Sequence, residues 1–167
     1  MRKGFTMIEL IFVIVILGVL ASVAIPRLAA TRDDAEIAKA ATNLSTAVSD
    51  IAAYYTAQGD FKKKASTGSN RVDATLTDMT NALDDVAQKV GYIKLKNVKC
   101  LKVEAKDATN ADNAKIEITK DSAGSNDNTC TNLTKLSGIK NMCGVATGAS
   151  AATLPCTINV GSSGVNF

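Results

Sequence analysis

The hydrophobic pattern divides the chain into an apolar N-terminal segment and a mixed remainder. From Phe5 to Ile25 there are 21 residues with a single charged side chain, that of Glu9. As an α-helix this segment is about 30 Å long, which matches the hydrocarbon thickness of a bilayer. Arg2 and Lys3 precede it and are expected to stay in the cytoplasm, so the rest of the chain is expected on the other side of the membrane.

A helical pattern continues beyond the apolar segment as far as residue 58. Apolar side chains recur there at alternating intervals of four and three, which predicts one buried stripe of a helix. The stripe consists of Ile37, Ala41, Leu44, Val48, Ile51 and Tyr55. Gly59 is expected to end the helix. Gly18 and Pro26 are expected to weaken it, with a kink or frayed turn at Pro26, because glycine disfavours helix and proline lacks an N–H.

Residues 59–167 predict a small domain that mixes helix and strand. The segment KKKASTGSNR at 62–71 is interpreted as a polar, basic link. A second helix is expected over 75–90, with Gly91 as its cap and an apolar face of Leu76, Met79, Leu83, Val86 and Val90. Strands are expected at 98–105 and 115–119, and a short helix over 131–141. A final hairpin is expected to place Ile158 and Val160 on one strand and Val165 and Phe167 on the other.

These elements together predict an α+β fold. A small antiparallel sheet of three or four strands would pack on the second half of the long helix, with the stripe of that helix as its core. The domain organisation is expected to be a leader at 1–4, a transmembrane stem at 5–26, the amphipathic half of the long helix at 27–58, and a globular α/β head at 59–167.

Composition excludes some classes of function. With 19 basic and 16 acidic side chains, the chain lacks the strongly basic balance of a general nucleic-acid binder. It contains no histidine, and no nucleophile–base pair or phosphate-binding loop is evident, so we expect no enzyme. No metal or other cofactor is expected. Calcium at loop aspartates is a less favoured alternative, since no EF-hand spacing occurs; these are Asp107, Asp112, Asp121 and Asp127.

The cysteines indicate an oxidising compartment. Four of them, Cys100, Cys130, Cys143 and Cys156, lie in the last 68 residues, which predicts two disulfides. A four-cysteine zinc site is disfavoured because the spacings of 30, 13 and 13 residues lack paired knuckles. Three disulfide pairings remain open. Cys100–Cys130 with Cys143–Cys156 is favoured because each closes a short local loop.

The N-terminus, MRKG followed by FTMIELIFVIVILGVLASVAIP, resembles the class III signal of type IV pilins and type II secretion pseudopilins. The likeness rests on a basic leader, Gly4, Phe5, Glu9, an unbroken apolar run and Pro26, and it covers about residues 1–40. It implies a pilin-like fold. It also implies that a prepilin peptidase cuts between Gly4 and Phe5 and methylates the new amine of Phe5, and that mature subunits polymerise through their stems.

The resemblance gives the residues of the stem specific roles. A carboxylate in a bilayer is costly, and in a filament Glu9 would pair with the Phe5 amine of a neighbouring subunit and fix the axial register. The alternative is that Glu9 lies solvated at the level of the lipid headgroups. The segment from Gly18 to Pro26 would lose helicity when stems pack together, which would let the filament stretch.

The predicted function is therefore that of a structural subunit of a type IV pilus-like filament, with a pseudopilin of a type II secretion system as the alternative. Expected partners are further copies of the chain, prepilin peptidase, the inner-membrane assembly machinery, and minor pilins or pseudopilins. The expected location is the bacterial inner membrane, followed by a periplasmic or surface filament. Two further alternatives are a secreted protein cleaved after Ala24 and a plain membrane anchor.

Overall fold

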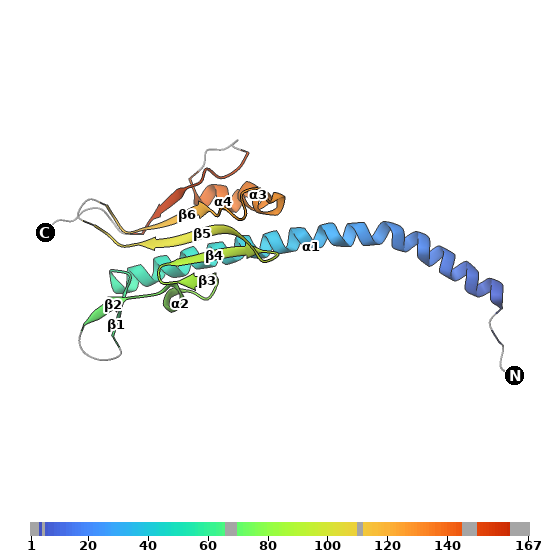
Figure 1. The fold of residues 1–167 in the computed structure, drawn as a ribbon, viewed down its shortest axis with the longest axis horizontal. Helices are drawn as coiled ribbons and strands as arrows, with labels where there is room; N and C mark the ends of the chain where they lie inside the picture. The colour runs from blue at the N-terminus through green and yellow to red at the C-terminus, as the bar shows by residue number, and fades with distance from the viewer. Residues whose placement is uncertain (1–3, 5, 66–69, 110–111, 145–149, 161–167) are drawn as a thin grey trace. The chain divides into compact units, whose positions relative to one another are not determined.

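The computed structural model describes residues 4, 6–65, 70–109, 112–144 and 150–160 of the 167 (Figure 1). It contains two compact units, Met1–Ala35 and Glu36–Phe167. Helix α1, Met7–Gln58, contributes its first part to one unit and its second part to the other. The other elements are β1 (Lys62–Lys64), β2 (Arg71–Asp73), α2 (Leu76–Met79), β3 (Asp84–Ala87), β4 (Val90–Leu95), β5 (Val98–Lys106), β6 (Lys115–Lys120), α3 (Asn128–Lys135), α4 (Ser137–Met142) and β7 (Cys156–Asn159). The α+β fold class predicted from the sequence is confirmed.

Helix α1 is continuous at the two positions expected to weaken it. The helical backbone runs unbroken through Gly18 and Pro26, so the frayed turn expected at Pro26 is wrong. Proline removes one backbone hydrogen bond, the one to the carbonyl of Ser22, and in a helix of 52 residues the flanking turns remain intact. Loss of helicity inside a packed filament stays a prediction.

The second unit is built around an antiparallel sheet with the strand order β3-β4-β5-β6-β7. Buried and less buried positions alternate along β4 and β6, as expected when one face of a sheet is covered. The expected pair of strands at 98–105 and 115–119 is confirmed as β5 and β6. The expected total of three or four strands is wrong: the sheet has five, because β3 and β4, which were not expected, join β5, β6 and β7.

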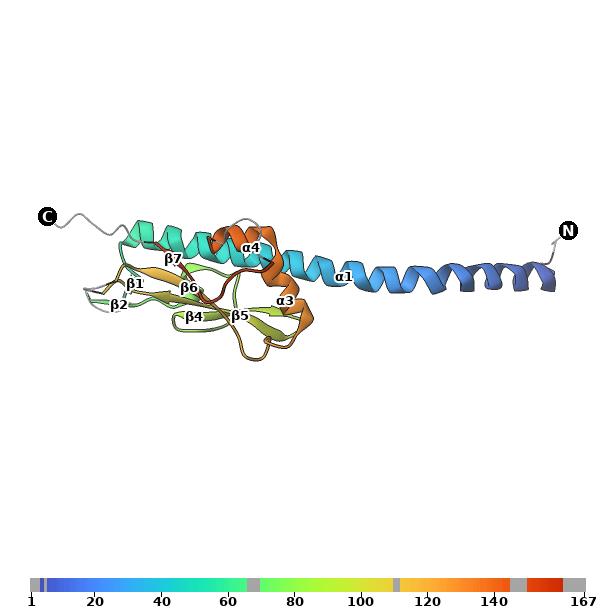
Figure 2. The same cartoon turned by 90° about the horizontal axis from the view of Figure 1, so that it is seen from above.

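The second half of α1 covers one face of this sheet, and the two lie side by side in both views (Figures 1 and 2). Ile37, Leu44 and Ile51 of the predicted stripe are buried, and Ala41, Val48 and Tyr55 pack against the same core. The sheet contributes buried aliphatic side chains from its three central strands, namely Ile93, Leu95, Leu101, Val103, Ala105, Ile116 and Ile118. The helical stripe was therefore a correct indicator of the core.

The helix expected over 75–90 is wrong. α2 ends after four residues, where Thr80 takes an extended backbone and its hydroxyl donates to Asp50 Oδ2 at 2.8 Å. Positive φ angles at Asp85 and Gln88 then lead the chain through β3 and its hairpin into β4. Gly91 lies in β4 and caps no helix. A Cβ there would lie 2.9 Å from Leu83 Cδ1, so a larger residue would require the Leu83 side chain to shift.

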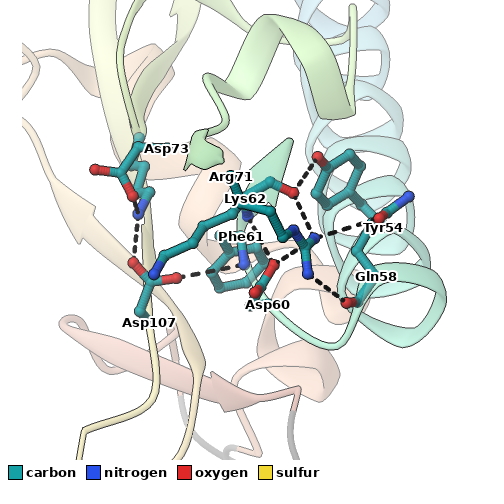
Figure 3. Close-up of polar contacts among 9 residues, drawn as sticks. Tyr54, Gln58, Asp60, Phe61, Lys62, Arg71, Asp73 and Asp107 are labelled. Carbon is teal, nitrogen blue, oxygen red and sulfur yellow. Dashed lines mark hydrogen bonds and ion pairs between the residues drawn. The ribbon is translucent and has the colours of Figure 1, made fainter. Parts of the chain in front are cut away.

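The basic segment at 62–71, expected to be a plain link, instead contributes to two paired strands, β1 and β2. Polar contacts anchor this hairpin at its base (Figure 3). Arg71 forms an ion pair with Asp60 at 2.7 Å and donates to the Lys62 carbonyl at 2.9 Å. On the other side Lys89 bridges Asp73 and Asp107, and Asp107 Oδ1 accepts from the N–H of Phe61 at 3.3 Å.

Asp78 also links the hairpin to α2, and it predicts an acid-sensitive contribution to stability. Its Oδ2 accepts from Lys63 Nζ at 2.6 Å and from the Thr75 N–H at 2.8 Å, and these bonds lower the pKa of Asp78 to about 2. Because the pKa is higher in the unfolded chain, the stabilisation is complete above about pH 4 and is lost as the pH falls towards 2.

We therefore expect Asp78→Asn to flatten the decrease in the free energy of unfolding between about pH 4 and pH 2. Urea denaturation of the mature chain in detergent, repeated across this pH range, measures the effect. The same acid slope in both chains would contradict the prediction.

The C-terminal region partly matches its expected form. The helix expected over 131–141 is two helices, α3 and α4, because Leu136 between them has an extended backbone. Asp127 begins α3 by accepting hydrogen bonds from the N–H groups of Thr129 and Cys130. In place of a self-contained final hairpin, β7 pairs with β6. The second strand of that hairpin, with Val165 and Phe167, falls outside the described residues.

Candidate functional site

The predicted processing site lies ahead of the first helical turn. Gly4 is exposed and non-helical, and among the described residues beyond its chain neighbours no atom lies within 4 Å of the position that a Cβ would occupy there. Phe5, the predicted site of methylation and assembly, falls outside the described residues. Gly4 therefore lies outside the helix that begins at Met7, where its backbone is open to a peptidase.

Glu9 has a defined local role that the sequence reasoning missed. Its Oε2 accepts from the N–H of Thr6 at 2.8 Å and from the Thr6 hydroxyl at 2.6 Å. Thr6 immediately precedes the helix and Glu9 is its third residue, so the two form a capping box at the start of α1. The signal was present in the sequence as Thr-x-x-Glu, the usual pattern of this motif.

The capping contact leaves part of the carboxylate available. Both hydrogen bonds from Thr6 end on Oε2, and Oε1 accepts none from the described residues. A carboxylate offers about four lone-pair sites, so one oxygen can cap its own helix while the other accepts from an amine of another molecule. The geometry is therefore compatible with the intersubunit pairing of Glu9, which stays a prediction.

The apolar part of α1 is fully exposed in the single chain. Met7–Ile25 is a 19-residue helix, long and apolar enough to cross a membrane, and none of it is buried within the protein. A helix that is apolar on all sides requires lipid or other apolar helices around it. Gly18 lies within this segment with open space around it, so it has no packing role in the isolated chain.

The cysteines form two disulfides, Cys100–Cys130 and Cys143–Cys156, which is the pairing that the short loops favoured. The first is buried and joins β5 to α3, and the second joins the end of α4 to β7. All four thiols are consumed, so they offer no ligands to zinc. The disulfides hold the C-terminal region of the head on the sheet.

The loop aspartates considered for calcium are engaged locally. Asp107 pairs with Lys89, Asp112 with Lys115, and Asp121 accepts from the N–H of Ala123. Asp127 caps α3, and hydrogen bonds from the backbone N–H of Cys130 and from Thr129 lower its pKa. Within the described ranges, no three Cys, Asp or Glu side chains are grouped as metal ligands would be.

The fold and the N-terminus together define a class: an α+β protein with a membrane-length N-terminal helix and a processing signal. Comparison with protein families identifies that signal, because the family described as "Prokaryotic N-terminal methylation motif" matches residues 1–25. No curated protein and no solved structure matches the chain. The chain thus carries the class III signal of type IV pilin-like and pseudopilin substrates of prepilin peptidase, a signal that marks structural, non-enzymatic proteins.

Proposed function

We propose that this protein is a structural subunit of a type IV pilus-like filament. Prepilin peptidase removes residues 1–4 and methylates the amine of Phe5, and mature subunits polymerise through α1. The observation that carries the proposal is the methylation motif at 1–25, which is continuous with an exposed apolar helix at Met7–Ile25. In the filament, the stems of other copies replace lipid around that helix, and van der Waals packing between stems stabilises the assembly.

The same motif also supports a second candidate, a pseudopilin of a type II secretion system. Both kinds of subunit start in the inner membrane and use an inner-membrane assembly machinery with minor subunits. The two disulfides favour the surface pilus, since covalent cross-links protect a domain exposed outside the cell. Electron microscopy of expressing cells separates the two candidates: we expect long surface fibres that react with an antibody to this chain.

Replacing Gly4 by leucine tests the processing step. A Cβ at this exposed position would meet no described atom within 4 Å other than its chain neighbours, so we expect the change to act on recognition by the peptidase and to leave the head intact. We expect the Gly4→Leu chain to accumulate in the membrane as uncut precursor, with filament yield reduced at least tenfold. Intact-mass measurement of the purified chain detects residues 1–4 directly.

The same measurement on the wild-type chain tests the proposal as a whole. The expected mature terminus is methylated Phe5. A terminus at Ile25 would contradict the filament function, because it would show a secreted protein that loses its stem. Normal cleavage of the Gly4→Leu chain would contradict the assignment of the cleavage site.

A further inference from the structure

A polar groove of about 310 Å³ lies between the second half of α1 and strands β3 and β4 of the head. Its lining is Glu36, Lys39, Ala40, Asn43, Asp84, Lys94, Leu95, Lys96 and Asn97. The lining therefore offers charges of both signs and two side-chain amides. A groove of this composition suits a partner that itself carries both charges.

Two charged side chains of the groove have no partner among the residues that the structure describes. Lys94 Nζ forms an ion pair with Asp85 Oδ2 at 2.7 Å, so this cation already has a partner within the chain. Lys39 and Asp84 are exposed and form no ion pair or hydrogen bond with any residue that the structure describes. They come from different elements, α1 and β3, so the groove holds one free cation on its helical side and one free anion on its sheet side.

The surface of the head indicates that its contacts with other subunits are polar. Among the described residues, the exposed large apolar side chains all lie in the stem between Met7 and Leu28, with the single exception of Val72. The part of the head that the structure describes thus presents no extended apolar patch to a neighbour. Orientation of one subunit against the next must then come from charge complementarity, which fixes register more than it adds affinity.

The complementary charges are present on the chain itself, directly after the membrane-length segment. Arg27 and Asp34 are exposed on α1 and have no ion pair or hydrogen bond within the described residues. Seven residues make nearly two helical turns, so the two side chains lie on one face about 10 Å apart. This face offers one cation and one anion, which are opposite in sign to the anion and the cation that the groove leaves without a partner.

We propose that the groove of one subunit binds the stem of a second copy of the chain, with that copy's Arg27 against Asp84 and that copy's Asp34 against Lys39. The inference rests on the proposed filament function and adds the contact that sets register between a head and a neighbouring stem. It concerns residues beyond the apolar span, so it is independent of the pairing of Glu9.

Charge reversal tests the proposal in assembled filaments. Asp84→Lys alone and Arg27→Glu alone are each expected to reduce the yield of sheared filaments at least fivefold. The combination of the two, which restores opposite charges across the contact, is expected to return at least half of the wild-type yield. Lys39→Glu and Asp34→Lys form a second, independent pair. Lys64→Glu is the matched control for Lys39→Glu, because Lys64 is an exposed lysine outside the groove without a partner among the described residues.

A second measurement reports the contact directly. In filaments of the Arg27→Lys chain, a zero-length carbodiimide should join the new amine to the carboxylate of Asp84. If ¹⁵N-labelled and unlabelled subunits are mixed before assembly, a cross-link between copies gives peptides of hybrid mass. Cross-links only within one copy, or to another acid, would overturn the inference, as would single reversals that leave the yield unchanged or pairs that fail to rescue it. Wild-type chains that form no filament would instead contradict the proposed function.

Discussion

Glu9→Gln is expected to be processed and inserted normally and to lower filament yield at least tenfold. Glutamine keeps the capping box, because its side-chain oxygen can still accept the hydrogen bonds that Thr6 donates to Glu9 Oε2. It lacks the negative charge that would pair with the Phe5 amine of a neighbouring subunit. If the charge fixes the axial register, a chain that preserves the helix start and loses only the charge must fail in assembly.

Two further variants make this expectation specific. Glu9→Ala removes both the cap and the charge, and it is expected to assemble as poorly as Glu9→Gln. Thr6→Ala removes only the hydroxyl part of the capping box and keeps the charge of Glu9, at a cost of about 1 kcal/mol to the helix start, and is expected to retain at least a third of the wild-type yield. Quantifying sheared filaments against total mature subunit in the membrane measures all three. The reverse order, with Glu9→Gln active and Thr6→Ala inactive, would show that Glu9 acts only by capping its own helix.

These variants matter because the structure gives Glu9 two compatible roles. Its Oε2 is occupied by Thr6 within the same chain, and Oε1 remains open to a partner. Before assembly the cap partly satisfies the carboxylate, and the N–H of Glu9 in the first turn of α1 donates to the Thr6 hydroxyl oxygen at 3.4 Å. In the filament, a neighbouring amine would complete the set of hydrogen bonds. Glu9, whose carboxylate makes a single stem costly to place in lipid, would then favour the assembled filament.

The sequence predicted those helices and strands in which apolar residues keep the same spacing over many positions. The four-and-three spacing from Ile37 to Tyr55 identified the buried stripe of α1. Alternation of apolar and polar residues, interrupted in β5 at Cys100 and Leu101, identified β5 and β6. Each of these elements buries one face against a single core. The local pattern and the tertiary environment therefore indicate the same structure.

Where the pattern was short, contacts between distant residues decided the outcome. Apolar residues from Leu76 to Val90 fit helical spacing, yet the helix stops because Thr80 bonds to Asp50, 30 residues earlier. The basic segment at 62–71 lacks apolar alternation and becomes a hairpin through ion pairs, including that of Arg71 with Asp60. The spacing of residues within a short segment does not predict these distant partners.

The candidate site was predictable in its residue types and not in its arrangement. Gly4, Glu9 and the apolar run could be read from the sequence, and the family match at 1–25 agrees with them. The polar groove could not, since it unites Lys39 of α1 with Asp84 of β3. Such a pairing follows only from the way in which α1 packs on the sheet.

Gly124→Ala is expected to be among the most destabilising single substitutions in the head. Between β4 and β5 the register shifts, so that Cys100 is an additional residue in β5, and both it and Leu101 are buried. This bulge directs Cys100 towards Cys130 of α3, with which it forms a disulfide. Gly124 is buried against that bond: a Cβ there would lie 2.7 Å from the Lys99 carbonyl oxygen and 2.8 Å from Cys130 Sγ.

Neither atom can move without a cost in free energy, because the Lys99 carbonyl belongs to the backbone of β5 and Cys130 Sγ belongs to a disulfide. The added methyl group must therefore displace the loop or strain the bulge, at a cost of about 2–3 kcal/mol. Gly138→Ala in α4 is the matched control, since open space surrounds that position and alanine favours helix over glycine. Urea denaturation of the oxidised mature chains measures both, and equal stability of the Gly124→Ala and wild-type chains would show that the loop yields without cost.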